Sequence, residues 1–139
     1  MYPVLIEPDD NGTLLVTCPD LPEVTTFGED QEDAMQRAVD AIEEALAARI
    51  AHQEDIPAPS PDGVRSVVAL PPLTAAKVEL YRAARVSGIT KAELGRRLGW
   101  RAPQIDRLFD LRNHSTIEQI DQALRAIGKR LTIGVQDAA

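Results

Sequence analysis

The proline pair Pro71-Pro72 separates two stretches of sequence whose apolar residues repeat with different periods. Before it, short runs with a period of two indicate strands, and a single longer stretch has helical spacing. After it, the spacing is helical almost to the end. Because two adjacent prolines remove two backbone donors and end a strand, we place the domain boundary here, with domains at residues 1–72 and 73–139. This order of elements predicts an α+β protein.

The first domain is expected to have the element order β-β-β-α-β. Strands are predicted at residues 4–7, 13–18, 24–27 and 64–70. Asn11-Gly12 is the strongest hairpin signal, because both central residues of such a turn take a positive φ. A helix capped by Asp30 is expected to end near His52. Its apolar stripe is predicted to consist of Met35, Val39, Ile42, Leu46 and Ile50, opposite an acidic and alanine-rich face.

The formal charge changes sign at the same boundary. Residues 1–72 hold fifteen Asp and Glu against three Arg, a net charge of −12. Residues 73–139 hold twelve Lys and Arg against seven Asp and Glu, a net charge of +5. Such asymmetry indicates two modules with different partners. The basic half suits nucleic acid, and the acidic half suits a basic partner or serves solubility alone.

The second domain is predicted to be all-helical and to contain a helix-turn-helix motif in residues 91–108. Gly95 provides a small residue where the two helices would approach, and Gly99 accepts the positive φ of the turn. The five apolar places of the motif are filled by Leu94, Leu98, Trp100, Ile105 and Leu108. The alternative is an ordinary helical hairpin. Around the motif, the sequence predicts helices capped by Thr74 and by Ser115 or Thr116, and a closing strand at 131–135.

The charged residues of the motif favour DNA over the simple hairpin. With Ile105 and Leu108 facing inward, the outward side chains near the start of the second helix are Arg101, Gln104 and Arg107. That end of the second helix enters the major groove in this motif, where Arg reads guanine and Gln reads adenine. The flanks, which usually meet phosphates, carry Thr90, Lys91 and Arg112. The alternatives are that Arg96 and Arg97 form a solvated face, and that Arg107 pairs with Asp106 or Asp110.

Catalysis, cofactors and metals are not indicated. Two histidines and one cysteine give no metal-ligand spacing, and the strand centres lack the acidic residues of a two-metal nuclease. Cys18 falls on an apolar strand face and is interpreted as a small buried hydrophobe. Without a long apolar run or a basic leader, we expect a soluble cytoplasmic protein with no membrane association.

Two long stretches resemble the HicB antitoxin family with a C-terminal helix-turn-helix. The first is "YPVLIEPDDNGTLLVTCPDLPEVTTFGED" followed by "AMQRAVDAIEEAL", and the second is "KAELGRRLGWRAPQIDRLFDLRNHSTIEQIDQALRAIG". The resemblance implies a partial RNase H-like first domain without catalytic acids. It also implies a partner, a HicA-like toxin that cuts mRNA and is neutralised by this domain. The second domain would bind double-stranded operator DNA as a homo-oligomer, a dimer or a tetramer, and repress its own operon.

Two other functions fit parts of the pattern. A stand-alone transcription regulator would use the first domain to sense a small ligand, and a nuclease would cleave with acids such as Asp20. The residues that contact the toxin, the operator sequence and the surface that joins the protomers stay open. The segment Leu131–Val135 is one candidate for that surface.

Overall fold

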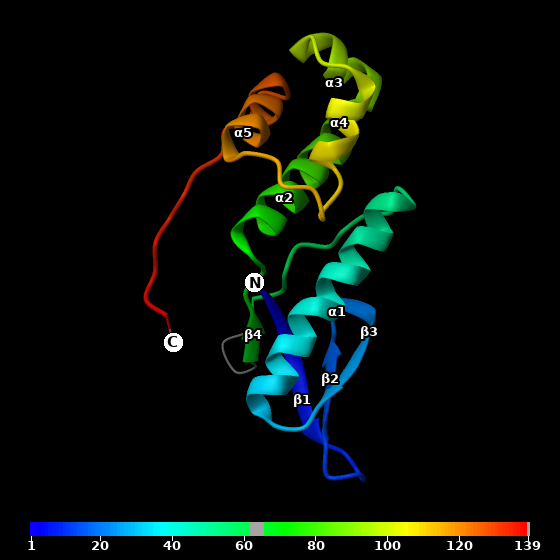
Figure 1. Ribbon diagram of the computed structural model, residues 1–139, viewed down its shortest axis with the longest axis vertical. Coiled ribbons are helices and arrows are strands. Elements are labelled where there is room, and N and C mark those ends of the chain that lie inside the picture. The colour runs from blue at the N-terminus through cyan, green and yellow to red at the C-terminus, as the bar shows by residue number, and fades with distance from the viewer. Residues whose placement is uncertain (62–65, 139) are drawn as a thin grey trace. The chain divides into compact units, whose positions relative to one another are not determined.

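Strands and one long helix come first along the chain and helices alone come after them, which confirms the α+β class. The computed structural model describes residues 1–61 and 66–138 and divides into two units, Met1–Thr74 and Ala75–Ala139 (Figure 1). The first unit contains β1 (Tyr2–Pro8), β2 (Leu14–Cys18), β3 (Leu21–Gly28), α1 (Gln31–Ala51) and β4 (Ser66–Val68). Helix α2 (Pro72–Ser87) leads into the second unit, which contains α3 (Lys91–Leu98), α4 (Ala102–Leu108) and α5 (Ile117–Ala126).

The four strands form an antiparallel sheet with the order β3-β2-β1-β4. Because β4 pairs with β1, the chain after α1 returns to the β1 edge of the three-stranded meander. The fourth strand is shorter than predicted, since Ala69 and Leu70 lie beyond it, while Val64 and Arg65 fall outside the described residues. The third strand begins earlier than predicted, at the fully buried Leu21.

The first hairpin turns differently from the two-residue turn that Asn-Gly predicts. Gly12 has a φ of 77°, whereas Asn11 does not have a positive φ. The Gly12 N–H donates to the Asp9 carbonyl at 3.1 Å, and the Asp9 N–H donates to the Thr13 carbonyl at 2.8 Å. These bonds close a longer loop in which one glycine alone takes the left-handed conformation, a common alternative in hairpins.

Helix α1 lies across one face of the sheet (Figure 1), but its buried stripe is not the predicted one. Ala34 and Ala38 are fully buried, whereas Met35 and Val39 are half-buried. The reason is the close approach of the helix to the end of β3, where a Cβ on Gly28 would lie 2.3 Å from the Ala34 nitrogen. Only small side chains fit at such a distance, so the alanines face the sheet and the larger residues lie beside them. The predicted stripe is correct from Ile42 onward.

Helix α2 starts at Pro72, where the missing N–H of proline costs no hydrogen bond. The prediction that Thr74 caps this helix is therefore wrong. Thr74 lies inside the first turn, is buried, and donates its hydroxyl to Glu43 Oε2 at 2.8 Å.

The helices of the second unit end where local signals place their ends. Gly88 and Gly128 take positive φ values of 73° and 86° after α2 and α5. Thr116 caps α5 together with Gln119, as one of the two predicted caps. Helix α4 ends at Leu108, the last residue of the predicted motif. The predicted strand at 131–135 is absent from this part of the structure, which adopts neither helix nor strand there.

Candidate nucleic-acid interface

A three-residue turn, Gly99–Arg101, joins α3 to α4, as the sequence predicts. The Thr90 hydroxyl oxygen accepts the Glu93 N–H at 3.1 Å and caps α3. Gly99 ends the helix with a φ of 70°, and the next N–H, that of Trp100, donates to the Gly95 carbonyl at 3.0 Å. Capping and turn chemistry therefore set the direction in which α4 leaves α3.

Gly95 lies where α3 approaches the start of α4. A Cβ at this position would lie 3.0 Å from the Trp100 carbonyl oxygen and 3.5 Å from Ile105 Cγ1. Three of the five predicted core residues are buried, namely Leu94, Ile105 and Leu108. The other two, Leu98 and Trp100, are half-buried. The close approach that the glycine permits thus brings the two helices onto a common apolar core.

We expect Gly95→Val to lower the free energy of unfolding of the second unit by about 1–3 kcal/mol, because the branched side chain forces the helices apart. Urea denaturation followed by the fluorescence of Trp100, the single tryptophan, measures this loss. Gly95→Ala should lose less, since the gain of up to about 1 kcal/mol in helix propensity offsets part of the strain. A Gly95→Val protein as stable as the wild type would contradict the close packing.

Two arginines of α3 are bound within the unit. Arg96 Nη2 lies 2.6 Å from Glu93 Oε2, and Arg97 Nε lies 3.1 Å from Glu93 Oε1. Both cations hold the pKa of the Glu93 carboxyl below its ordinary value. Arg97 also donates to the Ala126 carbonyl at 2.8 Å, which links α3 to the end of α5. These contacts support the interpretation of Arg96 and Arg97 as a structural, solvated face.

Lys91 is exposed but is likewise paired with an acidic side chain of the same unit. Its Nζ lies 3.1 Å from Asp106 Oδ1 and 5.6 Å from the centre of the Phe109 ring. Asp106 is thereby paired with Lys91 instead of with Arg107. Lys91 and the exposed Thr90 both lie at the start of α3, the flank where the sequence predicts phosphate contacts.

The remaining predicted contacts lie on the surface around α4. Arg101, Gln104, Arg107 and Arg112 are all exposed. Within residues 1–61 and 66–138, none of the three arginine side chains forms an ion pair. Gln104 has a local role as well, because its Oε1 accepts the Arg101 N–H at 2.8 Å at the start of α4. Three unpaired guanidinium groups around the start and end of one short helix form a surface suited to an anion.

A buried lysine that the sequence analysis missed lies against the end of α4. Lys77 of α2 is fully buried, and its Nζ donates to the carbonyl oxygens of Arg107, Asp110 and Asn113 at 2.8, 2.6 and 2.7 Å. Burial lowers the pKa of this ammonium group. The last turn of a helix exposes carbonyl oxygens without intrahelical partners, and Lys77 supplies a cation to them. The buried ammonium group therefore fixes the C-terminal end of α4 against α2.

The periodicity of α2 contained the signal for this burial. Lys77 precedes the buried Leu80 by three residues and the buried Tyr81 by four, so it lies on the apolar stripe of the helix. A lysine on such a stripe must either extend to the surface or find oxygen partners inside. Its partners come from the end of α4 and the loop after it, 30 or more residues later, which no local pattern reveals.

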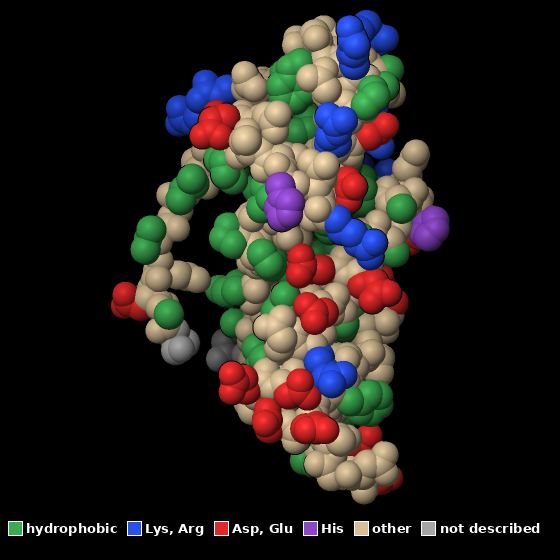
Figure 2. Space-filling model, viewed as in Figure 1, with side chains coloured by type: hydrophobic (Ala, Val, Ile, Leu, Met, Phe, Trp, Pro, Cys, Tyr) green, Lys and Arg blue, Asp and Glu red, His purple; other side chains and the backbone are tan. Residues whose placement is uncertain are grey.

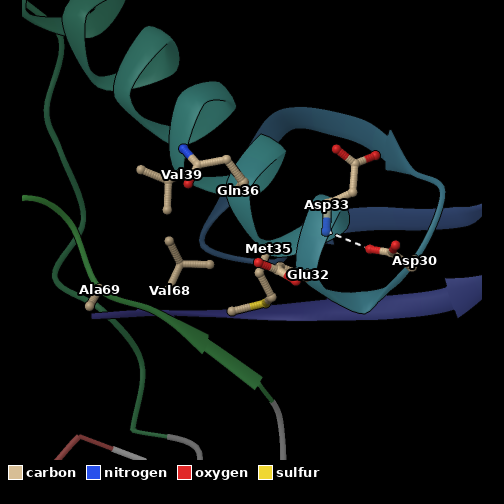
Figure 3. Close-up of a pocket in the computed structure, with 8 residues that line it drawn as sticks. All are labelled: Asp30, Glu32, Asp33, Met35, Gln36, Val39, Val68 and Ala69. Atoms are coloured by element: carbon tan, nitrogen blue, oxygen red, sulfur yellow. Dashed lines mark hydrogen bonds between the residues drawn. The ribbon is translucent and has the colours of Figure 1, made fainter.

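The first unit carries an open groove of about 590 Å³ beside the N-terminal half of α1 (Figure 3). Its lining combines acidic, polar and apolar side chains: Asp30, Glu32, Asp33, Met35, Gln36, Val39, Val68 and Ala69. The Asp33 N–H donates to Asp30 Oδ1 at 2.8 Å, which is the N-cap of α1. On the face shown in Figure 2, Asp and Glu side chains gather over this unit, while the second unit displays Lys and Arg.

Other kinds of site find little support among the residues that the structure describes. Their His, Cys, Asp and Glu side chains form no cluster able to hold a metal ion. Cys18 is buried, as predicted, and burial raises the pKa of its thiol. In the same residues, no helix combines the length and the apolarity that a membrane span requires.

Comparison with known proteins assigns both units to one kind of protein. A family model described as HicB-like antitoxin of bacterial toxin-antitoxin system matches residues 1–79. Antitoxin HicB of Pseudomonas fluorescens (strain Pf0-1) is 39% identical over 132 residues, which cover 94% of this chain and 90% of that protein. Antitoxin HicB of Escherichia coli (strain K12) is 37% identical over 133 residues, covering 95% and 96%. Antitoxin HicB 1 of Photorhabdus laumondii is 36% identical over 135 residues, covering 97% and 86%.

Proposed function

The chain belongs to the HicB-like family of antitoxins of bacterial toxin-antitoxin systems, and on this premise we propose that it has two separate binding functions. The first unit binds and neutralises a HicA-like toxin that cuts mRNA. The second unit binds double-stranded operator DNA through the surface around α4 and represses the operon. Neither function requires catalysis by this chain.

The observation that carries the proposal is the contrast between bound and unbound cations in the second unit. The cations of α3 are paired with Glu93 and Asp106, whereas Arg101, Arg107 and Arg112 are exposed and have no ion pair within the described residues. Unpaired guanidinium groups on the surface of a recognition helix are what direct readout of guanine in the major groove uses. The α3–turn–α4 geometry supports the entry of α4 into that groove.

The acidic first unit suits the other partner. A net charge of −12 over residues 1–72 would attract a basic, RNA-binding toxin and speed their encounter. The groove beside α1 combines acidic and apolar side chains, which suits the binding of such a protein. Co-expression with the toxin encoded beside this gene tests neutralisation. Growth arrest that persists although the chain is folded and abundant would refute this function.

One observation favours the second candidate, a stand-alone regulator that senses a ligand. The groove of about 590 Å³ is large enough for a small molecule. A ligand that changes operator affinity, together with the absence of a toxin gene beside this one, would support the regulator over the antitoxin.

We expect Arg107→Ala to weaken operator binding by about 1–3 kcal/mol, because one bidentate base contact is lost. Fluorescence anisotropy with labelled operator DNA at a fixed salt concentration measures the change. Arg96→Ala is the matched control, since Arg96 is already paired with Glu93 and its loss should leave operator affinity nearly unchanged. Equal affinities of both variants and the wild type would show that α4 does not carry the recognition surface.

A further inference from the structure

One acidic side chain lies among the cations of the surface around α4. Asp106 follows the buried Ile105 and precedes Arg107, so both charged side chains leave the helix on the side away from its core. The Asp106 side chain is 63% exposed. A carboxylate on a surface that approaches DNA is repelled by the phosphates. Asp106 therefore lowers the affinity for DNA in general, unless one base of the binding site compensates for its charge.

Lys91 holds one oxygen of this carboxylate and leaves the other free. Its Nζ donates to Asp106 Oδ1 at 3.1 Å from the start of α3, where phosphate contacts are predicted. Both residues line a groove of about 320 Å³ between α3 and α4, together with small residues such as Gly95 and Ala102. Among the residues that the structure describes, Oδ2 of Asp106 has no hydrogen-bond donor. This oxygen is an acceptor on a carboxylate that is held in place and partly neutralised.

We propose that Asp106 is a specificity-determining residue, which accepts a hydrogen bond from the N4 amino group of a cytosine in the major groove. Lys91 holds the carboxylate in place and contacts a neighbouring phosphate. The inference rests on the operator binding proposed for the second unit and adds to it the identity of one base. It gives the Lys91–Asp106 pair a role in recognition, since an exposed ion pair contributes little to stability.

The chemistry of a carboxylate selects cytosine over the other three bases. In the major groove, guanine presents the acceptors N7 and O6, and thymine presents the acceptor O4 and a methyl group. Adenine offers the N6 amino group but places the acceptor N7 beside it, which repels the carboxylate. Cytosine presents the N4 amino group as its one polar group in this groove. An anionic acceptor with one free oxygen therefore favours cytosine.

Arg107 is adjacent to Asp106 and has the opposite chemistry. Its guanidinium group donates, as guanine requires, whereas the carboxylate accepts. Neighbouring residues of a helix are about 100° apart around its axis, so the two side chains reach different bases. At a wrong base the charge of Asp106 stays uncompensated near the phosphates. The carboxylate thus weakens binding to unrelated DNA as well as strengthening binding to the correct site.

Selection of binding sites from random-sequence duplex DNA by the full chain tests the inference. We expect the wild type to select a C·G pair at one position where Asp106→Ala accepts any base pair, with the other preferences kept. Asp106→Asn should change the preferred base from cytosine to adenine, because an amide pairs with adenine N6 and N7. Glu118→Ala removes the same charge from the exposed start of α5 and should select the wild-type sites. A merely structural role of Asp106 would weaken binding to all sequences equally and would refute the proposal.

Replacement of the selected cytosine by N4-methylcytosine tests the contact atom. The methyl group lies on the major-groove side of the amino group and removes the free donor, while the base pair is kept. Fluorescence anisotropy at a fixed salt concentration should show that the wild type loses about 5-fold to 150-fold in affinity, the value of one good base contact. Asp106→Ala should bind both duplexes equally. Equal binding of the two duplexes by the wild type would overturn the inference.

Lys91→Met tests the other half of the pair. It leaves the carboxylate of Asp106 without its cation, so binding to every duplex should weaken, and the slope of log affinity against log salt should fall by about 0.9. Adding Asp106→Asn to Lys91→Met should restore part of the affinity, because the repelled charge is gone, while the slope stays reduced. An unchanged affinity and slope in Lys91→Met would refute the phosphate contact of Lys91.

Failure of this inference differs from failure of the proposed function. If the wild type selects no sequence from the random pool, the operator binding proposed for the second unit fails, and the inference fails with it. If the wild type selects a site and both Asp106 variants select the same site, the inference fails while operator binding stands. Neutralisation of the toxin is independent of both outcomes, because it is proposed for the first unit.

Discussion

Lys77→Met should lower the free energy of unfolding of the second unit by about 3–5 kcal/mol, the range found when one partner of a buried charged interaction is removed. Methionine fills the space of the aliphatic stem but donates nothing to the carbonyls of Arg107, Asp110 and Asn113. The Asn113 carbonyl would lose its ammonium donor, at about 1–3 kcal/mol for a buried acceptor left without a partner, while the carbonyls of Arg107 and Asp110 would keep the N–H donors of Asp110 and Asn113 but lose a charged one. These losses outweigh the relief from no longer burying an ammonium group. Denaturation monitored by Trp100 fluorescence measures the change.

Lys91→Met is the matched control for this substitution. Lys91 is exposed and its ion pair with Asp106 is at the surface, so its loss should cost about 1 kcal/mol or less. If both lysine variants were equally stable, Lys77 would not support the end of α4.

The same lysine predicts a pH dependence. Burial lowers the pKa of Lys77 in the folded protein below its ordinary value of 10.5. Between the lowered and the ordinary value, the unfolded chain holds more protons than the folded one at this group. The contribution of Lys77 to stability therefore rises with pH in this window and is least favourable below it. Lys77→Met should lack this rise when both proteins are titrated side by side, and identical pH profiles would contradict the assignment.

Local signals predicted the α3–turn–α4 unit well because each of them acts over a few residues. Thr90 caps α3 by accepting the N–H of the residue three positions later. Gly99 ends α3 because glycine adopts the left-handed conformation without strain. The three deepest residues of its core also follow from helical spacing alone. The exposed arginines around α4 were placed correctly on the surface for the same reason, although their partner is not visible in any local pattern.

The errors arose where the outcome depends on distances between elements. The stripe of α1 shifted to Ala34 and Ala38 because the helix approaches the sheet closely at Gly28, and hydropathy does not encode that distance. Lys77 was missed because its oxygen partners come from the end of α4 and the loop after it, far along the chain. The expected strand at 131–135 forms neither strand nor helix, because an alternating sequence does not by itself supply the neighbouring strand that it needs.

Replacing both Arg101 and Arg107 by Glu should abolish specific operator binding. Each lost base contact costs about 1–3 kcal/mol, so the pair costs about 2–6 kcal/mol, or about 30-fold to 20,000-fold in affinity. Repulsion between the new carboxylates and the phosphates adds to this loss. Because both side chains are exposed and have no ion pair in the part of the chain that the structure describes, stability should change little.

The control must remove the same charge elsewhere in the same unit. Arg82→Glu with Arg85→Glu changes the net charge equally, but both residues lie on α2. If operator binding depends on where the cations lie, the double variant on the α4 surface should abolish it. The double variant on α2 should weaken it only slightly. If long-range attraction alone were responsible, the two double variants would lose affinity equally.

Salt dependence separates the two possible roles of these arginines. If Arg101 and Arg107 contact phosphates, their removal should reduce the slope of log affinity against log salt by about 0.9 for each contact. If they contact bases, the slope should change little, while discrimination between the operator and unrelated DNA should collapse. The sequence predicts both side chains on the groove-facing surface of α4, and the structure places Arg101 just before its first residue and Arg107 in its last turn, which favours the second outcome. Neutralisation of the toxin should be unaffected in either case, because the acidic residues proposed to attract it lie in the first unit.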